Sequence, residues 1–171
     1  MVEKEKILIL GLGNEILMDD GIAPRLVQEI ADQYPFANVV YQTASVGGLD
    51  LVDQIQGYRT VILVDAIKTG KKKPGTVIFL TPADFSETLH LSNLHDISFL
   101  QAINMAEKIG INVPETIHII AVEIIEDRVF GRQFTPEVER QYPAIKSEVI
   151  NFLRTFFNQE APCQTSVKTS S

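Results

Sequence analysis

The chain has little cysteine and comparatively little positive charge. One of its 171 residues is cysteine, Cys163, which excludes an internal disulfide framework or a zinc knuckle and fits a reducing compartment. Fifteen basic residues against twenty-two acidic ones give a net charge of −7, which disfavours general binding to nucleic acid or an anionic membrane. No apolar run approaches transmembrane length, and "ILILGLG" is too short for a signal peptide. We therefore expect a cytoplasmic protein, monomeric by default, without a nucleic-acid or membrane partner.

Two common catalytic patterns are also missing. The sequence contains no G-x-S-x-G elbow, and Cys163 lies in a polar tail, so nucleophilic catalysis by serine or cysteine has no candidate residue. The H-E-x-x-H signature of many metalloprotease helices is absent as well. Any catalysis must therefore use other side chains.

What the chain does have is an alternation of β-rich apolar runs and amphipathic segments. Strands are predicted over residues 6–12, 37–42, 60–67, 75–80 and 116–124. Helices are predicted from about residue 21, over 47–55 and 97–109, and from Pro136 onward with Thr135 as N-cap. This alternation predicts an α/β fold, a three-layer sandwich with a mostly parallel central sheet and helices on both faces.

The length and the composition predict one domain. With 45% hydrophobic residues the chain can build one sizeable core, whereas two domains would each be small. We expect a single α/β domain over residues 1–157, followed by a disordered polar tail over residues 158–171.

The loop "GLGNEILMDDGIAP", residues 11–24, is the most informative stretch. Two glycines follow a strand and precede a helix, as in a nucleotide-binding turn. However, Ile16 stands where G-x-G-x-x-G needs its third glycine, and the pair Asp19-Asp20 would repel a phosphate. The loop suits a cation better, although either aspartate could simply cap the following helix.

Three titratable residues are predicted to lie beyond the carboxyl ends of the strands, where open parallel sheets bind ligands. Asp20 follows the first strand, Asp65 ends the run "VILVD", and His95 precedes the helix expected at residue 97. Two carboxylates and an imidazole suit a divalent metal such as zinc or nickel. Simpler interpretations stay open, since Asp65 could cap a turn and His95 could be a surface or hydrogen-bonded residue.

Five blocks of sequence carry a resemblance to a known family. In order, they are "ILILGLGNEILMDDGIAPRLVQEI", "GGLDLVDQI", "VILVDAI", "LHDISF" and "FTPEVERQYP", spread over residues 6–153. In content, order and spacing they resemble the endopeptidases that mature the large subunit of nickel-iron hydrogenases. The resemblance implies removal of a short C-terminal peptide from the large-subunit precursor after nickel insertion, with the nickel supplied by that precursor. A non-catalytic nickel-sensing chaperone that docks on the loaded subunit is the alternative.

The same resemblance implies roles for individual residues. The family positions that contact metal map onto Asp20, Asp65 and His95, and many members have glutamate where this chain has Asp20. As a mechanistic hypothesis, Asp20 or Asp65 acts as the catalytic general base. The backbone around Gly11, Gly13 and Asn14 is expected to stabilise an oxyanion or to support the loop.

Overall fold

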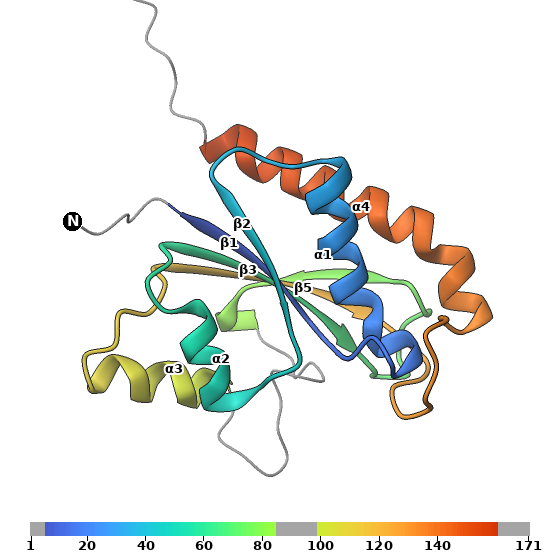
Figure 1. Ribbon diagram of the computed structural model, residues 1–171, viewed down its shortest axis with the longest axis horizontal. Coiled ribbons are helices and arrows are strands. Elements are labelled where there is room, and N and C mark those ends of the chain that lie inside the picture. Colours follow the sequence, from blue (N-terminus) through green and yellow to red (C-terminus); the bar gives the residue numbers. More distant parts are fainter. Residues whose placement is uncertain (1–5, 85–98, 161–171) are drawn as a thin grey trace, which may run out of the picture.

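The computed structural model describes residues 6–84 and 99–160, which form a central sheet between two layers of helices (Figure 1). The sheet has five strands in the order β2-β1-β3-β5-β4. Strands β1, β2, β3 and β5 run parallel, and β4 is antiparallel to β5. The strands are β1 (Ile7–Leu12), β2 (Val39–Ala44), β3 (Thr60–Ile67), β4 (Val77–Leu80) and β5 (Thr116–Glu123). The predicted α/β class with a mostly parallel sheet is confirmed.

Helices cover both faces of this sheet. The long helix α4 (Pro136–Glu160) and α1 (Ile22–Gln33) pack on one face, whereas α2 (Gly48–Ile55) and α3 (Phe99–Lys108) pack on the other (Figure 1). Two short 3-10 helices, η1 (Met18–Gly21) and η2 (Pro82–Asp84), follow β1 and β4. None of the described helices is both long enough and apolar enough to cross a membrane.

The central strand β3 shows why the sheet could be predicted from the sequence. All eight of its residues are buried, because helices cover both of its faces. Ile62 and Val64 contact the α1–α4 layer, whereas Val61 and Leu63 contact the α2–α3 layer. A strand buried on both faces is mostly apolar, and this gives the run Val61–Val64 seen in the sequence.

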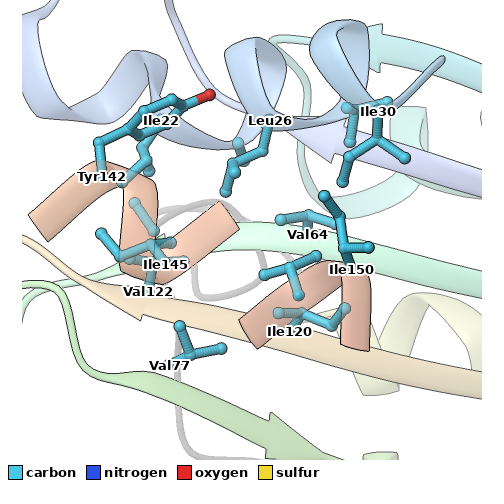
Figure 2. Packing of buried hydrophobic residues seen from close by; sticks show 14 of the residues in the cluster. Ile22, Leu26, Ile30, Val64, Val77, Ile120, Val122, Tyr142, Ile145 and Ile150 are labelled. Atoms are coloured by element: carbon cyan, nitrogen blue, oxygen red, sulfur yellow. The ribbon is translucent and has the colours of Figure 1, made fainter. Parts of the chain in front are cut away.

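Packing between α1 and α4 fixes where α1 begins. Apolar side chains one helical turn apart on α1 meet a matching stripe of α4 above β3, β4 and β5, and burying each such side chain contributes roughly 1.5–3 kcal/mol (Figure 2). The labelled members of this cluster are Ile22, Leu26, Ile30, Val64, Val77, Ile120, Val122, Tyr142, Ile145 and Ile150. The start of α1, and with it η1, is thereby held at the carboxyl end of β1.

Several boundaries differ by a few residues from those predicted. β2 begins and ends two residues later than predicted, whereas β3 has the predicted bounds, and Ala66 and Ile67 beyond Asp65 still pair with β5. The expectation that Asp65 ends its strand is therefore wrong. Helix α4 continues to Glu160, past the boundary expected at residue 157, while residues 161–171 of the predicted tail lie outside the described residues.

Candidate functional site

The strand order creates a switch point between β1 and β3. The chain leaves β1 through α1 toward β2 on one side, while β3 pairs with the other side of β1. In open parallel sheets, ligands bind in the crevice outside the carboxyl ends of the strands at such a point. Gly11 of β1 is in register with Val64 of β3, so Asp65 lies at the level of Leu12, where β1 ends. The loop that carries Asp20 begins just beyond.

Asp65 is a carboxylate inside a strand of apolar residues. It is completely buried, and its Oδ1 accepts a hydrogen bond of 2.8 Å from the N–H of Ala66. Because side chains alternate along a strand, Asp65 belongs to the same face as Val61 and Leu63, the face covered by α2 and α3. Burying an ionised carboxylate is costly, so its presence at a switch point favours a functional role over a packing role.

Asp20 lies in η1 and is also buried. Its Oδ2 accepts a 2.8 Å hydrogen bond from the N–H of Asn14, which closes the loop between β1 and η1 on itself. Gly13 permits this closure: its φ is +154°, and a Cβ there would collide with the carbonyl oxygen of Asp20. Gly11 permits a second close approach, since a Cβ on it would lie 2.7 Å from the carbonyl oxygen of Ala23 in α1.

Two roles were expected of this loop: to stabilise an oxyanion or to support the loop itself. Gly13 and Asn14 hold the loop in the shape that positions Asp20. The N–H of Asn14 is directed at the Asp20 carboxylate, and an oxyanion role for the loop stays a prediction.

The neighbouring residue, Asp19, has a structural role that the sequence did not reveal. Its Oδ1 accepts a 2.7 Å bond from the N–H of Thr135. Its Oδ2 accepts bonds from the N–H groups of Ile125 (3.2 Å) and Glu126 (3.1 Å) and from the Thr135 hydroxyl (2.9 Å). Asp19 is fully buried and thereby ties the β1 loop to the segment between β5 and α4.

The two expectations about helix capping have different outcomes. The residue before α1 is Gly21, and neither η1 nor α1 has a side-chain cap, so the interpretation of Asp19 or Asp20 as a helix cap is wrong. The backbone carbonyl of Thr135 does accept the N–H of Glu139 at 2.9 Å in the first turn of α4. Thr135 thus stands at the predicted N-cap position before Pro136, and its hydroxyl donates to Asp19.

Glu123, at the end of β5, is a second structural carboxylate. It is fully buried and accepts hydrogen bonds from the N–H and hydroxyl of Thr69 (2.8 and 2.9 Å) and from the N–H of Gly70 (2.8 Å). It thus fixes the turn that follows β3. Asp19 and Glu123 hold loops in place, and Asp20 and Asp65 are the candidates for chemistry because they lie at the β1/β3 switch point.

His95, the third predicted ligand, lies outside the described residues. Within residues 6–84 and 99–160, no group of three or more histidine, cysteine, aspartate or glutamate side chains could hold a metal. The set formed by Asp20, Asp65 and His95 therefore stays a prediction.

The family model for hydrogenase maturation proteases matches residues 24–152, most of the chain. The chain belongs to this family. The resemblance to this family that the sequence showed is thus confirmed.

Individual relatives agree with the family match. The chain is 26% identical over 155 residues to hydrogenase expression/formation protein HupD of Rhodobacter capsulatus, covering 89% of this chain and 73% of that protein. It is 26% identical over 156 residues to hydrogenase 2 maturation protease of Escherichia coli, covering 87% and 91%. The solved hydrogenase maturating endopeptidase HybD from E. coli superposes with a TM-score of 0.66 at 25% identity, covering 88% and 93%.

Proposed function

We propose that this protein is an endopeptidase that removes a short C-terminal peptide from the nickel-loaded large-subunit precursor of a nickel-iron hydrogenase. The observation that carries the proposal is the burial of two carboxylates, Asp20 and Asp65, at the β1/β3 switch point of a member of the hydrogenase maturation protease family. In this proposal the nickel belongs to the substrate, and the protein recognises it through Asp20, Asp65 and His95.

The proposed ligands explain why cleavage would wait for nickel. Carboxylate oxygens of Asp20 and Asp65 and an imidazole nitrogen of His95 would occupy open positions on nickel already held by the precursor. The C-terminal segment is then fixed beside the carboxylates, and this positioning lowers the barrier. A precursor without nickel lacks this contact, so only a precursor into which nickel has been inserted would be held in position for cleavage.

Hydrolysis needs a base for the attacking water. Asp20 or Asp65 takes a proton from the water, the oxygen adds to the scissile carbonyl carbon, and the C–N bond breaks as the leaving amine gains a proton. The substrate's nickel would supply Lewis-acid polarisation of the carbonyl or the water. The bond from Asn14 to Asp20 keeps that carboxylate in one orientation before substrate arrives.

The test is a processing assay that measures the mass of the precursor. Wild-type protein is mixed with nickel-loaded and metal-free precursor, and only the loaded form is expected to lose a C-terminal peptide. Asp20→Asn, Asp65→Asn and His95→Ala are each expected to slow cleavage by at least about 100-fold, the usual contribution of a positioned acid–base or metal-contacting group. Asp53→Asn, an exposed position on α2, is the matched control and should cleave at the wild-type rate.

Two results would contradict parts of the proposal. If Asp65→Asn or His95→Ala cleaves as fast as wild type, the ligand set is wrong. If the protein binds the loaded precursor and the mass of the precursor never changes, the protein is a non-catalytic nickel-sensing chaperone.

A further inference from the structure

Two loops that meet at the carboxyl end of the sheet carry exposed apolar side chains. Phe130 is 78% exposed, and Ile16, Ile125 and Val129 are exposed as well. We call these four residues the ridge. Ile16 comes from the loop after β1, and the other three come from the segment between β5 and α4; these two loops lie side by side (Figure 1). Clustered exposed apolar side chains on a soluble domain mark a site of interaction.

Hydrogen bonds hold the backbone that carries the ridge. The N–H of Met18 donates to the carbonyl of Gly131 at 2.8 Å, and the N–H of Gly131 donates to the carbonyl of Ile16 at 2.9 Å. The Glu126 carboxylate accepts the N–H groups of Arg128 (2.7 Å) and Val129 (3.2 Å), which shapes the turn before Phe130. A side chain presented on such a fixed backbone loses little conformational entropy when a partner covers it.

The ridge is continuous with the candidate site. Met18, which bonds to Gly131, lies in the same four-residue helix η1 as Asp19 and Asp20. Asp19 in turn holds the N–H groups of Ile125 and Glu126. A protein that rests on the ridge therefore has its neighbouring chain close to Asp20.

Positive charge flanks the ridge in a chain whose net charge is −7. Arg128 and Arg132 stand on either side of Phe130, and both are exposed. The nearby acid Asp127 is paired with Lys68 at 2.7 Å, whereas no ion pair of the described residues involves Arg128 or Arg132. Around Phe130 this charge complements an acidic partner surface rather than a basic one, whereas the exposed Glu15 adjoins Ile16 in the chain.

We propose that the ridge docks the folded body of the hydrogenase large-subunit precursor. Phe130 enters an apolar pocket of the precursor, and carboxylates at the rim of that pocket face Arg128 and Arg132. Exposed aromatic and arginine side chains are typical anchors of protein interfaces. The inference rests on the proposed function and adds a means of partner recognition that does not involve nickel.

The test compares two exposed apolar side chains at opposite ends of the sheet. Phe130→Ala should raise KM for the nickel-loaded precursor at least about tenfold, while kcat stays within about twofold, since docking contacts contribute to binding and not to the chemical step. Ile109→Ala removes a side chain that is 68% exposed near the amino end of β5, and it should leave KM and kcat unchanged. Neither substitution should change Tm, because both side chains face solvent.

The arginines give an independent readout. The double variant Arg128→Gln/Arg132→Gln should raise KM and weaken its dependence on salt concentration, because screened charge pairs are lost. An unchanged salt dependence would overturn the charge component of the docking surface.

The outcomes separate this inference from the proposed function. If wild type cleaves the precursor and Phe130→Ala has a wild-type KM, the docking inference is overturned and the proposed function stands. If wild type binds the precursor without shortening it, the proposed function is overturned, and a tenfold or larger rise in Kd for Phe130→Ala would still uphold the ridge. Sedimentation that shows a wild-type dimer, dissociated by Phe130→Ala without a change in KM, would make the ridge a self-interface instead. If wild type neither binds nor cuts, both fail.

Discussion

At the scale of single residues, Asp19 and Asp20 are neighbours in the chain with different surroundings. Asp19 accepts four hydrogen bonds from Ile125, Glu126 and Thr135, which belong to the segment between β5 and α4. Asp20 accepts its bond from Asn14 within its own loop. One carboxylate joins two distant segments, and the other is positioned by the loop that carries it.

We predict that Asp19→Asn destabilises the protein by roughly 2–4 kcal/mol. The amide retains one acceptor oxygen but directs an NH2 group at donors that become buried without a partner, and each such group costs roughly 1–3 kcal/mol. Equilibrium unfolding in urea would measure the loss. Asp32→Asn, at an exposed position of α1, should stay within about 0.5 kcal/mol of wild type, and equal stability of the two variants would contradict the bracing role of Asp19.

A second residue-scale prediction concerns Gly13→Ala. The added Cβ would meet the carbonyl oxygen of Asp20, and alanine disfavours the positive φ found there, so the loop must shift. We expect at least about 2 kcal/mol of destabilisation and a loss of precursor processing that exceeds what the lower stability explains. Gly57→Ala is the control: φ is also positive, but a Cβ there meets nothing, so any loss should be of stability alone. Normal processing by Gly13→Ala would show that the loop shape is not needed.

At the scale of elements, ion pairs tie α1 to α4 beside their apolar contact. Glu29 of α1 accepts from Arg25 at 3.1 Å and from Lys146 of α4 at 3.0 Å. The Arg25 guanidinium also lies over the Tyr142 ring, with Cζ 4.3 Å from its centre. Burial alone would raise the pKa of Glu29, but the hydrogen bonds from Lys146 and Arg25 outweigh it and hold that pKa below 4.5.

The lowered pKa of Glu29 predicts a pH-dependent contribution to stability. Because the unfolded chain binds the proton more readily, the contribution is fully present above the ordinary carboxyl pKa and is lost as the pH falls through the lowered one. Glu29→Gln should therefore be less stable than wild type by up to about 1 kcal/mol at pH 7, and the difference should shrink from about pH 5 downward. Urea titrations of both proteins across this range would test it, and a difference independent of pH would contradict it.

The elements could be predicted from sequence where packing imposes a pattern on the side chains. β3 reads as one apolar run because both faces are buried, and α1 shows its helical stripe because one face meets the core. β2 lies at the edge of the sheet and is half-exposed, so its apolar signal is weak and its predicted end was two residues early. Strand β3 passes Asp65 because its backbone pairing with β5 does not depend on the side chain.

Contacts between distant segments could not be predicted in the same way. The donors to Asp19 lie 106 to 116 residues further along the chain, and no local pattern marks them. Asp20 and Asp65 could be selected because the carboxyl ends of parallel strands share one edge of the sheet, a rule that needs only strand order along the chain. The sequence signal for Asp19 was limited to its place in an acidic pair.

At the scale of the whole molecule, the strands of the sheet differ in burial. This difference predicts which backbone hydrogen bonds open locally and which open only when the whole protein unfolds. β3 is buried at every position between β1 and β5, whereas β2 has one strand neighbour among the described elements and no fully buried residue. Amide hydrogen exchange is slowest where opening requires global unfolding. The amides of β3 that pair with β1 and β5 should therefore exchange at the global unfolding rate, and those of β2 at least about tenfold faster.

Exchange measured by NMR under native conditions would check this order, with low concentrations of urea added to identify the amides that open only globally. Exchange in β2 as slow as in β3 would mean that the edge strand is protected as strongly as the core. The two carboxylates of the candidate site differ in their surroundings: Asp65 lies in the central strand β3, and Asp20 lies in η1, outside the sheet. We therefore expect the Asp65 amide to be among the slowest to exchange and the amides of residues 15–17, which lie outside the sheet, to exchange faster, so that the two carboxylates belong to regions of different local stability.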